Sequence, residues 1–242
     1  MRILTIVSCI IISVALCGCS SSTNAPETSG SLSGIVFVYK QNSPFSAPYY
    51  DGATVQLEGT SFSTLTDSAG HWSISGIPAG AYTVDVTKAG YGLLRWFAVP
   101  VFGGGTNIVG PSYLPSLPSD SVHIDAIDTV SNPQGLNIKV SGHSTNSVSW
   151  AVFVDLTSDV NPEDSHLLIT NAWGTNSTTP LAYVTIQDLL REGMHSGTKV
   201  YISACAVSGV GSQGGAYQDP RDGSTRYTAC GPKSNVLTYV LP

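Results

Sequence analysis

The sequence predicts an all-β protein with two antiparallel β-sandwich domains in tandem, placed after an N-terminal targeting segment. Three observations predict this fold class. Short runs of β-branched and aromatic residues recur at intervals of about ten residues, with turn residues between them. Turn formers are abundant, with 25 Gly and 14 Pro. Charged residues make up only 11% of the chain, which leaves little material for helices.

Residues 1–18 have the pattern of a signal peptide, because Arg2 precedes an apolar run that is too short to cross a bilayer comfortably. The motif Leu16-Cys17-Gly18-Cys19 at its end resembles the lipobox of bacterial lipoproteins. The resemblance implies cleavage before Cys19 and a diacylglycerol on its thiol. It therefore implies export and lipid anchoring in the bacterial cell envelope, at the outer membrane or the cell surface. The alternative is an ordinary secretory signal that leaves Cys19 free.

A polar tether at residues 19–31 precedes the first predicted domain, which spans residues 32–110. Its strands alternate apolar and polar residues. In the strand that begins at His71, Trp72 and Ile74 are expected to face the core and His71 the solvent. In the preceding short strand, Phe62 and Leu65 are expected on the inner face.

Regularly spaced turn glycines, prolines and core aromatics mark this first domain. They are Gly34, Asp51-Gly52-Ala53-Thr54-Val55, Thr66-Asp67 with Gly70 and Trp72, Ile77-Pro78-Ala79-Gly80 with Tyr82 and Val84, and Lys88-Ala89-Gly90-Tyr91. Together they resemble the carboxypeptidase regulatory-like domain, a transthyretin-type sandwich with a carbohydrate-binding-like fold. The resemblance implies a regulatory or binding module, and it carries over no carboxypeptidase activity.

A proline-rich linker at residues 111–119 is expected to separate this domain from a second sandwich at residues 120–242. The segments "GTKVYISACAV" and "KSNVLTYV" of the second domain resemble the last two strands of a fibronectin type III or similar Ig-like domain. The helical candidate here is "IQDLLREGMH", which should end near Gly193.

Two cysteines, Cys205 and Cys230, lie outside the N-terminal segment. An even pair in an oxidising compartment predicts a disulfide. A metal-binding pair is the alternative, although neither cysteine has a C-x-x-C neighbour.

The candidate ligand-binding residues are aromatic. Phe45, Tyr49 and Tyr50 lie in an inserted loop with two prolines that departs from the family pattern, and Trp173 ends a predicted strand. Flat rings on loops can stack on the faces of sugars. The alternative is that these rings cover the ends of the sandwiches.

An acidic segment offers a weaker site for calcium. It contains Asp155, Asp159, Glu163 and Asp164, and carboxylates that lie close together suit Ca²⁺. The spacing matches no EF-hand, so a solvated loop between strands is the plainer interpretation.

No arrangement of nucleophile, base or metal ligands predicts catalysis or a cofactor. The net charge of −6 without a basic patch argues against a nucleic-acid partner. Two hypotheses remain for a non-catalytic envelope lipoprotein held to the membrane by its lipid. The first is a module that binds a glycan or an envelope protein through loops at the sandwich ends. The alternative is a structural spacer in an envelope protein complex.

Overall fold

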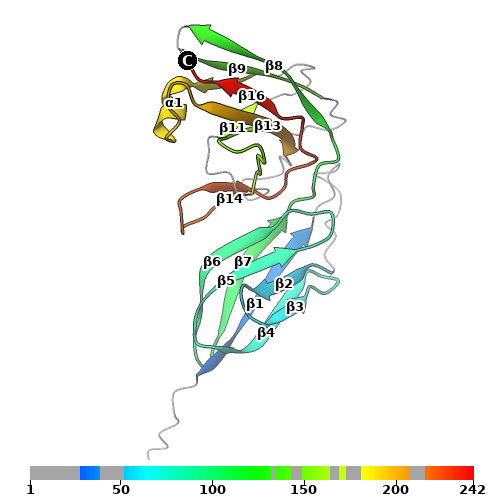
Figure 1. Ribbon diagram of the computed structural model, residues 1–242. Coiled ribbons are helices and arrows are strands. Elements are labelled where there is room, and N and C mark those ends of the chain that lie inside the picture. Colours follow the sequence, from blue (N-terminus) through cyan, green and yellow to red (C-terminus); the bar gives the residue numbers. More distant parts are fainter. Residues whose placement is uncertain are drawn as a thin grey trace, which may run out of the picture.

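The computed structural model describes residues 28–38, 52–131, 134–142, 149–163, 169–172, 181–207 and 216–242. These residues form two β-sandwiches, one after the other along the chain (Figure 1). Each sandwich has its own hydrophobic core, and the two cores share no residue. The predicted all-β class is confirmed, and the described part of the chain has no helix long and apolar enough to cross a membrane.

The first sandwich packs a three-stranded sheet against a four-stranded one. The smaller sheet has the order β4-β1-β7, with β4 at His71–Pro78, β1 at Ser29–Val38 and β7 at Thr106–Leu114. The larger has the order β3-β2-β5-β6, with β3 at Ser63–Leu65, β2 at Thr54–Leu57, β5 at Gly80–Thr87 and β6 at Leu94–Val101. Most pairs are antiparallel, but β1 and β7 pair in parallel. The chain therefore closes the smaller sheet by placing its last strand beside its first.

Trp72 anchors the first core, as the sequence predicts. Burial alternates along β4, so that Trp72 and Ile74 face inward while His71 and Ser73 face solvent. The Trp72 ring lies against Gly34 of β1, where a Cβ would come within 2.9 Å of the ring. A glycine is needed at this position because any side chain would displace the tryptophan.

The expected inward position of Leu65 is wrong, since this residue is 63% exposed. Strand β3 pairs with β2 so that Leu65 lies opposite Thr54, on the outer face. The buried position belongs to Thr66, whose hydroxyl accepts a hydrogen bond from the Ala53 amide at 3.0 Å. Apolar alternation in this short edge strand is therefore a poor guide to its register.

The segment predicted as a linker is part of the first sandwich. Strand β7 continues to Leu114, whose side chain is fully buried in the first core. Beyond it, Gly92 donates to the Pro115 carbonyl at 2.9 Å, and the Leu117 amide donates to the Gly90 carbonyl at 2.9 Å. Residues 115–117 are thus hydrogen-bonded along residues 90–92 rather than extended into solvent.

The second sandwich packs a sheet of order β11-β10-β13-β16 against one of order β12-β9-β8. Its strands are β8 at Val122–Ser131, β9 at Gln134–Gly142, β10 at Ser149–Asp155, β11 at Ile169–Ala172, β12 at Leu181–Thr185, β13 at Lys199–Val207 and β16 at Leu237–Val240. The predicted helix is present as α1, Ile186–Arg191, with Thr185 as its N-cap. A separate hairpin, β14 at Ala216–Gln218 and β15 at Thr225–Tyr227, extends toward the first sandwich (Figure 1).

Truncation of Trp72 should destabilise the first sandwich far more than truncation of its neighbour. Trp72→Ala should lower the free energy of unfolding by roughly 3–5 kcal/mol, because it leaves a large cavity. His71→Ala, on the solvent face, should change it by less than about 0.5 kcal/mol. Urea unfolding monitored by circular dichroism would measure both values. Equal losses at the two positions would show that the register of β4 is wrong.

Candidate functional site

The candidate site is a cleft at the junction of the two sandwiches. It has a volume of about 410 Å³ and lies between strand β6 of the first sandwich, hairpin β14–β15 and the loop after β10. The residues that line it are Leu93, Arg95, Asn161, Glu163, Tyr217, Arg221 and Arg226. Three of the five arginines in the sequence therefore line one cleft, in a chain with few charged residues.

A β-bulge in β6 directs side chains into this junction. Val84 of β5 pairs with Trp96 and Tyr82 with Val99, so Phe97 and Ala98 together occupy the space opposite one residue of β5. Ala98 has a φ of 53°, in the left-handed region that L-residues rarely adopt. The extra residue keeps both Trp96 and Val99 on the core side and leaves Arg95 and Phe97 on the outer face.

Hairpin β14–β15 forms because its connecting residues favour a turn. The segment Asp219-Pro220-Arg221-Asp222-Gly223-Ser224 joins the strands, and Gly223 has a φ of 77°. The Asp219 carboxylate accepts hydrogen bonds from its own turn, including the Arg221 amide at 3.0 Å. Asp222 accepts from the Ser224 amide at 2.9 Å. Short acidic side chains thus satisfy the turn's backbone donors.

Asp219 is the electrostatic centre of the hairpin. Its side chain is only 1% exposed and accepts from Arg221 Nε at 2.8 Å, Arg221 Nη2 at 2.6 Å and Arg226 Nε at 3.2 Å. Hydrogen bonds from the Arg221 side chain, more than any other cause, hold the pKa of Asp219 well below its usual range. A buried carboxylate with two guanidinium partners stays ionised, because both partners stabilise its charged form.

Arg95 is held in a similar way by the first sandwich. Its Nε and Nη2 donate to the two carboxylate oxygens of Asp85, each at 2.6 Å, and Nη2 lies 3.1 Å from Glu58 Oε1. The hydrogen bonds to Asp85 raise the pKa of Arg95 above its already high ordinary value. Because this pairing is bidentate, it fixes the plane of the guanidinium as well as its position.

Aromatic rings and ion pairs join the two sandwiches across the cleft. The rings of Phe97 and Tyr217 pack with their centroids 5.7 Å apart. The Arg221 guanidinium lies 5.4 Å from the centre of the Phe97 ring, and Arg95 lies 5.8 Å from that of Tyr217. Arg221 Nη1 also lies 3.6 Å from Glu58 Oε1 of the first sandwich. Each sandwich therefore contributes both rings and charges to the same contact.

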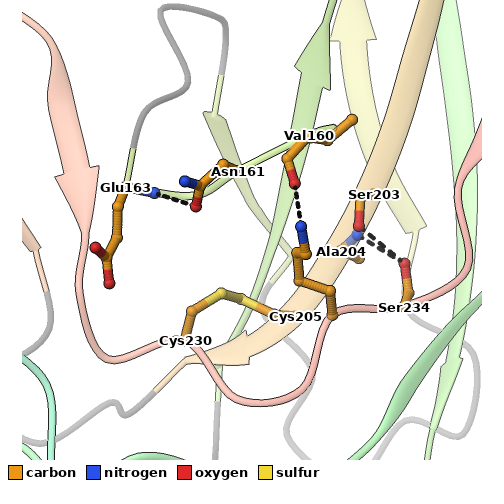
Figure 2. The surroundings of a disulfide bond; sticks show 9 residues. Val160, Asn161, Glu163, Ser203, Ala204, Cys205, Cys230 and Ser234 are labelled. Carbon is orange, nitrogen blue, oxygen red and sulfur yellow. Dashed lines mark hydrogen bonds between the residues drawn. A yellow bond between two sulfur atoms is a disulfide. The ribbon is translucent and has the colours of Figure 1, made fainter. Parts of the chain in front are cut away.

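The chain after β15 is tied to both sandwiches. The Thr228 hydroxyl donates to the Leu93 carbonyl at 2.6 Å, and a Cβ on Gly92 would lie 2.7 Å from the Thr228 carbonyl oxygen. Only glycine permits this approach between the two backbones. The next residues join β13 through the predicted Cys205–Cys230 disulfide, which the structure contains (Figure 2).

A turn after β10 completes the wall of the cleft. The side-chain oxygen of Asn161 accepts from the Glu163 amide at 3.2 Å, as Figure 2 shows. Arg226 Nη1 donates to the Glu163 carbonyl at 2.5 Å, and the Tyr227 amide donates to the Pro162 carbonyl at 3.2 Å. The hairpin and this turn therefore hold each other in place.

The cleft is described without the aromatic ligand-binding residues predicted from the sequence. Phe45, Tyr49, Tyr50 and Trp173 lie outside the described residues, as do Cys19 and Asp164. The structure thus adds a candidate site made of residues that the sequence did not single out as ligand-binding aromatics.

The other predicted calcium ligands do not come together. The Asp155 side chain accepts from the Thr157 amide at 3.0 Å, while Asp159 pairs with Lys233 at 3.2 Å. The Glu163 side chain belongs to the cleft instead. Among the described residues, no group of three or more His, Cys, Asp or Glu side chains lies close enough to hold a metal ion.

The cleft was not predictable from apolar periodicity, because hairpin β14–β15 has only three residues in each strand. The segment "AYQDPRDGSTRY" nevertheless carries a hairpin pattern, with a Pro and an Asp-Gly turn between two aromatic-containing runs. Its three charged turn residues, Asp219, Arg221 and Asp222, are unusually dense for this chain. This local density of charged residues is the sequence signal that points to a site.

Fold and site together define a class: a tandem β-sandwich with a polar cleft at the junction. Residues 31–106 match the family model of the carboxypeptidase regulatory-like domain, which confirms the resemblance predicted for the first sandwich. No curated protein matches the chain.

Several solved structures are similar to the chain. One is a type II cohesin–X-dockerin complex from Acetivibrio cellulolyticus, with 26% identity over 36% of this chain, 58% of that chain and a TM-score of 0.30. The chain therefore spans little more than half of that relative. A candidate carbohydrate-binding protein from Bacteroides uniformis has 11% identity over 89% of this chain and 100% of its own, with a TM-score of 0.33. A DUF3823 family protein from Parabacteroides merdae has 9% identity over 88% and 98%, with a TM-score of 0.33.

Neutralising Asp219 should destabilise the protein in a pH-dependent way. A carboxylate with a lowered pKa in the folded state stabilises that state above its unfolded pKa of about 3.9, and this contribution is lost as the pH falls through the folded pKa. Asp219→Asn should therefore lower the melting temperature by a constant amount from about pH 8 to about pH 5. Below about pH 4 the difference from the wild type should shrink.

The control is Asp128→Asn, which breaks the half-exposed ion pair of Asp128 with Lys139 and should have little effect at any pH. Differential scanning calorimetry across this pH range measures both variants. If the difference in melting temperature between Asp219→Asn and the wild type stays unchanged below about pH 4, the lowered pKa of Asp219 is contradicted.

Proposed function

We propose that the protein is a non-catalytic binding module of the bacterial cell envelope that holds a carbohydrate in the cleft between its sandwiches. The observation that carries the proposal is the lining of the cleft. Its volume of about 410 Å³ is within the range of small-molecule sites, and its walls combine an aromatic ring with several fixed polar groups. The matched family is itself a regulatory-like domain.

Three lining side chains have hydrogen-bonding groups to offer a ligand. Within the described part of the chain, no hydrogen bond reaches the Tyr217 hydroxyl or the Glu163 carboxylate, and the Asn161 amide nitrogen donates to no protein group. Sugar hydroxyls both donate and accept, so they complement this mixture of one hydroxyl, one carboxylate and one amide. The Tyr217 ring adds an apolar face of the kind that stacks on a sugar.

Rigid contacts between the sandwiches favour a second function, the structural spacer. The Thr228–Leu93 hydrogen bond, the Phe97–Tyr217 packing and the pairing of residues 115–117 along residues 90–92 all oppose bending at the junction. A spacer needs this stiffness but does not need unused polar groups in a cleft. Binding measurements therefore separate the two functions.

Removing one hydroxyl from the cleft should weaken saccharide binding without changing the fold. Tyr217→Phe keeps the ring packed on Phe97 and deletes one hydrogen bond between the Tyr217 hydroxyl and the saccharide. The affinity for the saccharide should therefore fall about threefold to tenfold. Tyr183→Phe, on the distant strand β12, is the matched control and should bind like the wild type. A glycan array identifies the saccharide, and isothermal titration calorimetry measures both variants. Binding of no saccharide would favour the spacer.

Lipid anchoring through Cys19 places the module in the envelope under this proposal. Cys19→Ser should shift the protein from the detergent phase to the aqueous phase, or leave its signal peptide uncleaved, because no thiol remains for the lipid. Cys17→Ser is the control and should partition like the wild type. Triton X-114 phase separation of whole-cell extracts measures this. Unchanged partitioning of Cys19→Ser would show that the protein is not anchored at this residue.

A further inference from the structure

We infer that the cleft selects uncharged saccharides and rejects acidic ones such as uronic acids. The inference rests on the proposed carbohydrate function and concerns the charge of the ligand. It follows from how the charges around the cleft are paired, and from which groups face the space.

Every arginine in the cleft already has a carboxylate partner. Arg95 is paired with Asp85 and Glu58, and Arg221 with Asp219. Arg226 is paired with Asp219 and Asp222. None of the three guanidiniums therefore presents an uncompensated positive charge to a ligand.

Negative charge exceeds positive charge around the site. Three guanidiniums are matched by the four carboxylates that pair with them, and Glu163 adds a fifth carboxylate on the wall itself. The chain as a whole is also acidic, with a net charge of −6. An anionic ligand would meet repulsion from this excess, which dissolved salt reduces because the cleft is open to solvent.

Uncharged hydroxyl groups find favourable partners in the same geometry. Among the described residues, Arg95 Nη1 has no hydrogen-bond acceptor, because its partners take Nε and Nη2. Arg221 Nη1 lies 3.6 Å from Glu58, beyond hydrogen-bonding distance. Arg95 and Arg221 therefore each keep an Nη1 group that can donate a hydrogen bond to a ligand. The plane of each guanidinium is already fixed by its carboxylate partner. Fixed donors cost little ordering entropy when a hydroxyl binds.

Matched saccharide pairs test this selectivity directly. Gluco-, galacto- and manno-oligosaccharides would each be titrated against the corresponding uronic acid oligomers, which differ only by a carboxylate in place of a hydroxymethyl group. In the pair that binds, the neutral member should bind at least about tenfold more tightly. Raising the salt from about 50 mM to about 500 mM should narrow this ratio, because salt screens the repulsion.

A substitution of Glu163, on the wall of the cleft, tests whether its charge contributes to this selectivity. Glu163→Gln removes one negative charge from an exposed residue and should narrow the ratio about threefold, by strengthening binding of the uronate member. Glu192→Gln, at the exposed end of α1, is the matched control and should leave the ratio unchanged.

The outcomes separate this inference from the function on which it rests. Tighter binding of a uronate member, or a ratio that Glu163→Gln leaves unchanged, would overturn the charge selectivity while the carbohydrate function stands. If no member of any pair binds, the carbohydrate function itself fails.

Discussion

The ionised Asp219 carboxylate is the group on which the junction depends. It is buried at the base of hairpin β14–β15, where it fixes Arg221 and Arg226 and accepts the Arg221 backbone amide. Arg221 then reaches Glu58 and Phe97 of the first sandwich, and Arg226 reaches the turn that carries Glu163. The hairpin and the turn that carries Glu163 therefore take their positions from one buried charge, which desolvation makes costly unless both arginine partners stay in place.

A strained residue and a close backbone approach meet at the same junction. Ala98 has a left-handed φ within the β6 bulge, and Gly92 lies where a Cβ would clash with Thr228. The strain at Ala98, worth about 1–3 kcal/mol, persists only where surrounding contacts determine the conformation. Here it directs Phe97 and Arg95 toward the hairpin. The bulge in β6 therefore interrupts the regular alternation of its side chains and, by doing so, brings Phe97 and Arg95 into contact with the hairpin.

Sequence reasoning was reliable where burial alternates over many residues and weak where structure is set by tertiary contacts. The positions of Trp72 and Ile74 and the helix capped by Thr185 follow from local patterns. The Cys205–Cys230 bond is predicted from the cysteine count, since these two are an even pair outside the N-terminal segment. Leu65 does not, because a three-residue edge strand takes its register from its neighbour. The cleft depends on side chains from positions 95, 161 and 217–226, and no local pattern brings those segments together.

The location of the cleft explains why its charges can be both numerous and paired. At the end of a single sandwich, arginines would lie in water, and each ion pair would contribute little. At the junction, the side chains of Arg95 and Arg226 are only 13% and 14% exposed. Hydrogen bonds of these two side chains are stronger away from water, and the side chains adopt fewer orientations there. A tandem of two sandwiches thus creates, between them, a preorganised polar surface that neither sandwich presents alone.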